Sequence, residues 1–120
     1  DDTFFVPVRI AFHVIQSIDY YVSIDSDGFD WKAFDFNWKE DAPEVLLDKP
    51  GTIEYLTQVK AKVASNLDLS DTALMGSDET FSPRFSSPLE RLVYAARHAH
   101  HHIGQLSLDL QRRGLAEITW

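Results

Sequence analysis

The chain has 120 residues, 44% hydrophobic and 25% charged, which is typical of a single globular domain spanning residues 1–120. Its formal net charge of −8, without a cluster of Lys and Arg, disfavours nucleic acid and anionic membranes as partners. The absence of cysteine excludes disulfides, thiolate metal ligands and a cysteine nucleophile. The sequence has no apolar run long enough to span a membrane and no signal peptide, so we expect a cytoplasmic protein.

A first helix is predicted roughly from Thr3 to Ile24. Pro7 is tolerated only near the start of a helix, which favours a beginning close to that residue. The apolar residues of this segment recur at helical spacing: Ile10, Ala11, Val14, Ile18, Tyr21 and Val22.

Residues 25–51 form a long irregular stretch that is both acidic and aromatic. So many large aromatic side chains make a fully solvated linker implausible, and we expect much of the stretch to pack across the helices as a cover. Two interpretations of Trp31 and Trp38 stay open: they line a substrate cleft, or, as is more common for such residues, they belong to the core.

A second helix is predicted after Pro50 and Gly51, with Thr52 as its N-cap and an end between Asn66 and Asp68. A polar loop then continues to residue 86. The apolar stripe of this helix is expected to comprise Ile53, Leu56, Val59, Val63 and Leu67.

The last helix has the clearest boundary signals in the chain. Ser87 is the predicted N-cap, Pro88 suits the first helical position, and Glu90 can bond back to the cap. Gly114 is the predicted stop, after about seven helical turns. With three long helices and no convincing pair of strands, the sequence predicts an all-α fold.

The histidines of the chain fall within two of the predicted helices. At about 100° of rotation per residue, His98 and His102 share one edge of the buried face of the last helix, one turn apart, where two imidazoles can reach one ion. His101 points away from the apolar stripe, toward solvent or an added element, and His100 falls on the opposite flank. His13 lies on the flank of the apolar stripe of the first helix.

If these two helix edges meet, three histidines form a cluster. Three protein ligands that leave positions open for water or substrate are typical of a catalytic metal site. Two other interpretations stay open: His13 is an ordinary boundary residue, or all the histidines are metal-free and hydrogen-bonded in the interior.

Two segments of the sequence resemble a known family. Residues 97–106, with His, three residues, His, then x-Gly-Gln, and the Leu-Gln-Arg-Arg-Gly of residues 110–114 resemble the closing helix of the DinB-like (DinB/YfiT) superfamily. Residues 12–19 resemble its earlier metal-binding helix. The resemblance implies a four-helix bundle that holds a divalent metal ion through His13, His98 and His102.

The family's activities are varied. Its members include S-transferases that use bacillithiol or mycothiol, as well as hydrolases and isomerases. The resemblance therefore implies a small-molecule substrate, with a low-molecular-weight thiol as one candidate; a metal-dependent hydrolase and a non-catalytic metal-binding or structural bundle are the alternatives. Zinc or nickel is the expected metal, and three imidazoles also suit iron or copper. Gln105 and Asp109 are candidates for orienting a ligand or moving a proton, although for Asp109 an inert surface role is favoured.

The sequence departs from the family at its start. Only a few residues precede His13, and the sequence opens without Met, so we expect the first helix of the family to be absent from residues 1–120. Three helices alone would expose an apolar seam. We therefore expect either a further N-terminal helix in the natural protein or a homodimer in which a second copy covers the seam.

Overall fold

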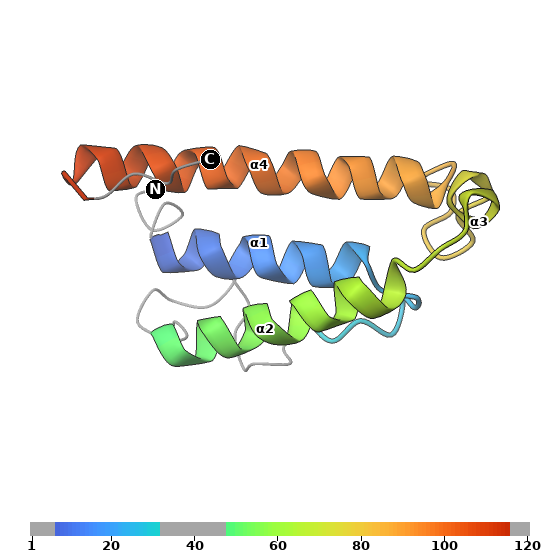
Figure 1. The fold of residues 1–120 in the computed structure, drawn as a ribbon, viewed down its shortest axis with the longest axis horizontal. Helices are drawn as coiled ribbons and strands as arrows, with labels where there is room; N and C mark the ends of the chain where they lie inside the picture. Colours follow the sequence, from blue (N-terminus) through green and yellow to red (C-terminus); the bar gives the residue numbers. More distant parts are fainter. Residues whose placement is uncertain (1–6, 32–47, 116–120) are drawn as a thin grey trace.

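The computed structural model describes residues 7–31 and 48–115. The regular secondary structure of these residues is helical, and they contain no strand (Figure 1). The elements are α1 (Pro7–Tyr21), α2 (Lys49–Asn66), the short α3 (Asp71–Met75) and α4 (Pro88–Arg112). The all-α prediction is confirmed for this part of the chain. Trp38 and most of the predicted cover lie outside the described residues.

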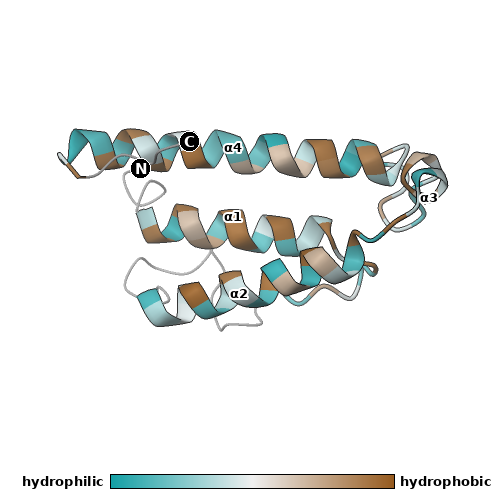
Figure 2. Cartoon of the chain, viewed as in Figure 1, coloured by the Kyte–Doolittle hydropathy of each residue, from teal (hydrophilic) through white to brown (hydrophobic). Residues whose placement is uncertain are grey.

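Helix α1 lies between α4 and α2 and packs against both (Figure 1). It runs in the same direction as α2 and opposite to α4. Figure 2 shows hydrophobic residues recurring along the length of α1 and α4, as expected for helices that each contribute one face to a shared core. The central position of α1 explains why its side chains are buried on more than one side.

Two apolar clusters fill the interior. In the first, between α1 and α2, the rings of Phe12 and Tyr55 have centroids 5.5 Å apart. The second joins the end of α1 to α4 and to the loop before α4. The members of the first cluster are Phe12, Ile15, Tyr55 and Val59, and those of the second are Tyr21, Phe81, Phe85 and Ala95.

The start of α2 differs from the prediction. The N-cap is Asp48 rather than Thr52, and its Oδ1 accepts a hydrogen bond of 2.8 Å from the backbone N–H of Gly51. Pro50 lies inside the first turn, where its missing N–H costs nothing because that donor has no intrahelical partner. The helix therefore begins three residues earlier than the predicted cap.

The predicted apolar stripe of α2 is correct only in its second half. Val59 is buried, but Ile53 and Leu56 are 52% and 41% exposed. Tyr55 is buried in their place, because its ring packs on α1 while its hydroxyl donates a hydrogen bond of 2.7 Å to Oδ2 of Asp19. A tyrosine that buries its ring and satisfies its hydroxyl can displace aliphatic residues from the helix interface.

The polar loop between α2 and α4 contains α3 and is held in place beside α1 and α4 by the contacts of Arg91. The buried Arg91 of α4 forms an ion pair of 2.6 Å, Nε to Oδ2, with the buried Asp78 and also donates to the backbone carbonyl of Tyr21. Removing one partner of such a pair typically costs about 3–5 kcal/mol, because a charge is left buried and uncompensated. This contact fixes the loop beside the helices that carry the histidines.

The boundaries of α4 follow the prediction. The hydroxyl of Ser87 accepts a bond of 3.2 Å from the N–H of Glu90, whereas the Glu90 carboxylate accepts one of 2.7 Å from the N–H of Ser86, the residue before the predicted partner Ser87. At the other end Gly114 adopts a φ of +66°, which favours glycine. None of the described helices is long and apolar enough to cross a membrane.

An apolar groove of about 610 Å³ runs between the first turns of α1 and α2 and the last turns of α4. Ile53, one of the exposed apolar residues of α2, contributes to its wall. The sequence predicts an exposed apolar seam without locating it, and this groove is an apolar surface between three helices. The further helix and the second copy expected to cover the seam stay predictions.

Candidate metal centre

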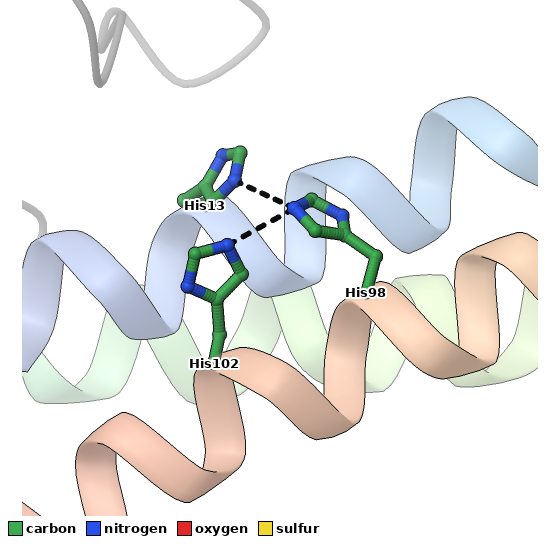
Figure 3. Close-up of side chains that lie close together, drawn as sticks. All are labelled: His13, His98 and His102. Carbon is green, nitrogen blue, oxygen red and sulfur yellow. Dashed lines mark hydrogen bonds between the residues drawn. The ribbon is translucent and has the colours of Figure 1, made fainter.

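His13, His98 and His102 converge where the middle of α1 faces α4 (Figure 3). His98 and His102 are one turn apart on α4, and Nε2 of His98 lies 3.0 Å from Nε2 of His102 and 3.3 Å from Nε2 of His13. One nitrogen from each ring lies within 4.8 Å of the others. The predicted three-histidine cluster is therefore present in the structure.

The other two histidines of α4 stay outside the cluster. His100 and His101 are exposed, in agreement with the predicted outward direction of His101. Nδ1 of His100 is hydrogen-bonded at 2.8 Å to the backbone carbonyl of Ala96, one turn earlier. His102, in contrast, is only 6% exposed. The run of histidines thus divides into two residues that face α1 and two that face outward.

Gln105 determines which nitrogen of His102 can act as a ligand. Its side-chain oxygen lies 2.6 Å from Nδ1 of His102. A carbonyl oxygen can only accept a hydrogen bond, so Nδ1 of a neutral His102 carries the proton and Nε2 keeps its lone pair. That lone pair points toward the other two rings. The predicted orienting contact of Gln105 is present.

Asp109, the other candidate for such a role, does not reach the histidines. Its Oδ2 forms an ion pair of 2.7 Å with Nε of Arg113, one turn further along α4. This pairing agrees with the inert surface role favoured for Asp109.

His98 is held in the form that can bind a cation. Burial lowers its pKa, and the neighbouring imidazoles of His102 and His101, followed by Arg84 and Arg97, lower it further. A lowered pKa means that the ring is neutral at neutral pH, and neutral imidazole is the form that acts as a metal ligand.

The contacts among the three rings are better satisfied by a cation than by protons. Nε2 of His98 faces both other Nε2 atoms, and its single proton or single lone pair can complete only one of these contacts as a linear hydrogen bond. Ligands about 2.0–2.1 Å from a tetrahedral zinc ion would lie roughly 3.3–3.4 Å from one another. Two of the three observed separations, 3.0 and 3.3 Å, are close to that value, and the third, between His13 and His102, is within 4.8 Å. The donor set therefore fits a divalent ion.

A cleft of about 290 Å³ opens beside the cluster, with His13 and His98 in its wall. The ring of Trp31 lies 4.7 Å from that of Tyr20, and its backbone carbonyl accepts a hydrogen bond of 2.7 Å from Gln16 of α1. Trp31 thus belongs to the wall of a cleft, one of its two predicted roles. The other residues of the wall are Ser17, Tyr20, Tyr21 and Arg84.

Arg84 is a charged residue of this wall that sequence reasoning did not select. It lies in a Ser- and Pro-containing loop before α4, where neither periodicity nor a motif distinguishes it. Only the folded arrangement brings this loop to the cleft, so no local signal could have identified Arg84.

Comparison of the chain with family models, curated proteins and solved structures found no match.

Proposed function

We propose that this chain is a divalent-metal-dependent enzyme of the DinB-like superfamily whose metal ligands are His13, His98 and His102. The observation that carries the proposal is the convergence of three imidazole Nε2 atoms beside a cleft of about 290 Å³. An open cleft distinguishes this arrangement from closed structural sites, in which protein ligands fill every coordination position. Zinc and nickel are the first candidates for the metal.

Thiol-dependent S-transfer is the reaction that we propose for this site. A divalent ion held by three neutral imidazoles keeps its full positive charge and, when bound, would lower the pKa of a thiol or water beside it. The chain has no cysteine, so the thiol must be a small molecule that enters the cleft. Gln105 keeps the His102 ring in the ligand tautomer, and the aromatic wall excludes water from the apolar part of the substrate.

Metal content measured by elemental mass spectrometry tests the proposed site. We expect near-stoichiometric zinc or nickel in the tag-free protein and a loss of most of it in His13→Ala and His98→Ala. His100→Ala is the matched control, because His100 lies on the same helix outside the cluster, and it should keep its metal. Full occupancy in His98→Ala, or no metal in the wild type even after incubation with zinc and nickel, would refute the proposal.

A further inference from the structure

Arg84 stands in the wall of the same cleft as His13 and His98. Its guanidinium lies over three aromatic rings, 5.2 Å from the centroid of Tyr21, 5.2 Å from that of Phe85 and 5.3 Å from that of Tyr94. Stacking on several rings holds a planar guanidinium in place while leaving its N–H groups available to a ligand.

No carboxylate pairs with Arg84 within residues 7–31 and 48–115. Other cations of the chain do have acidic partners: Arg91 pairs with Asp78, Arg113 with Asp109, and Lys62 with Asp19. The hydrogen bond of Arg84 goes instead to the hydroxyl of Tyr94, at 3.4 Å. In a chain with 19 acidic and 11 basic residues, an arginine in a cleft that has no acidic partner among the described residues is available for an anion from outside.

Arg84 and two histidines of the cluster, His13 and His98, line the same cleft. The Tyr94 ring that Arg84 covers is stacked near the His98 ring, with centroids 6.1 Å apart. A molecule in the cleft can therefore touch the guanidinium at one end and approach the histidines at the other. A volume of about 290 Å³ suits a small ligand, slightly below the usual range for drug-sized molecules.

We propose that Arg84 binds a carboxylate of the substrate and so selects an anionic small molecule whose reacting end faces the histidine cluster. The inference rests on the proposed function and specifies the substrate class of that site. A guanidinium offers a carboxylate two parallel N–H donors, so the pairing fixes orientation as well as charge. The aromatic wall formed by Tyr20 and Trp31 packs against the apolar part of the same molecule.

Two probes of matched size test the proposal. Zinc-loaded protein is titrated by calorimetry with 3-mercaptopropionate and with its uncharged analogue 3-mercaptopropionamide. We expect the carboxylate to bind at least about tenfold more tightly, the scale of a hydrogen bond to a charged group. In Arg84→Met this preference should fall to about one, while the affinity for the amide stays unchanged.

Arg97→Met is the matched control. Arg97 also lies over the Tyr94 ring, 5.4 Å from its centroid, but does not belong to the wall of the cleft. This variant should keep the preference for the carboxylate. Equal preference in Arg84→Met and the wild type, or no preference in the wild type, would overturn the proposal.

Metal content, measured on every sample, separates this result from the proposed function. If the wild type holds no metal, the proposed function fails, and the anion site is tested on metal-free protein. The same two compounds are then titrated while the NMR signals of the Trp31 side chain are followed. A preference for the carboxylate that disappears in Arg84→Met supports the anion site, and its absence refutes it. Circular dichroism of each variant confirms that a loss of binding is not a loss of folding.

Discussion

At the scale of single residues, the pairing of Gln105 with His102 is the most specific feature of the site. The two residues are three positions apart on α4 and therefore lie on the same face of the helix. The Gln105 oxygen, 2.6 Å from Nδ1, fixes both the tautomer and the orientation of the ring. A ligand fixed in this way loses little freedom when it binds an ion.

Replacing Gln105 with Leu removes this support while leaving all three histidines in place. We expect the affinity for zinc to fall by roughly 10–100-fold, the usual effect of losing the hydrogen-bond partner of a metal ligand. Competition with a chromophoric chelator measures the change. Gln111→Leu, an exposed position on the same helix, is the control and should bind zinc like the wild type. Unchanged affinity in Gln105→Leu would show that the contact has no role in metal binding.

The individual histidines show how far single-residue reasoning extends. The common edge of His98 and His102 follows from helical rotation alone, because the two residues belong to one helix. The approach of His13 depends on how α1 packs against α4, which spacing within either helix cannot specify. Arg84 could not be selected at all, since its place in the cleft depends on how its loop packs against Tyr21 of α1, which is distant in the sequence.

At the scale of elements, Glu90 adds to the capping of α4 by Ser87. Its carboxylate accepts hydrogen bonds from the hydroxyl and the backbone N–H of Ser86, at 2.6 and 2.7 Å. These two bonds lower the pKa of Glu90 below its ordinary value of 4.5, the hydroxyl having the larger effect. A carboxyl whose pKa is lower in the folded state stabilises the fold above its ordinary pKa. That contribution is lost as the pH falls through the lowered value.

Glu90→Gln should therefore lower the melting temperature at pH 7 and have progressively less effect below about pH 4.5, where the carboxyl becomes protonated first in the unfolded chain and then, at lower pH, in the folded one. Thermal unfolding followed by circular dichroism between about pH 2 and about pH 7, a range that spans both forms of the carboxyl, measures the difference. Glu54→Gln, an exposed position on α2, is the control. A difference between Glu90→Gln and wild type that stays constant over this range would contradict the assigned role of the charge.

The helices were predictable to the extent that local chemistry determines them. Both ends of α4 follow from capping residues, and α1 begins at the proline that limits it. The predicted start of α2 is wrong because Thr52, the predicted cap, follows the Pro-Gly pair, whereas the side chain that caps the helix belongs to Asp48, which precedes it. Its buried face was misassigned because hydrophobicity alone does not anticipate that Tyr55 packs on α1 while bonding Asp19. The short α3 has only five residues, too few for an apolar period to appear.

At the scale of the whole molecule, the histidine cluster connects two helices that are distant in sequence. α1 lies at the centre of the fold, and His13 provides its contribution to the cluster from the side that faces α4. An ion held by all three rings would join α1 to α4 directly. Such an ion binds the folded chain far better than the unfolded one, because the ligands from the two helices meet only in the folded state.

Metal should therefore raise the melting temperature of the protein, and His13 should be required for most of the rise. At a free zinc concentration 100 times the dissociation constant, binding to the folded state alone adds about 2.7 kcal/mol to the free energy of unfolding. In His13→Ala the ion retains only His98 and His102, which belong to one helix and can bind it without fixing α1. Calorimetry of chelator-treated protein with and without zinc measures both shifts, and His100→Ala should behave like the wild type. A zinc-induced rise of equal size in His13→Ala would mean that the ion is held by α4 alone.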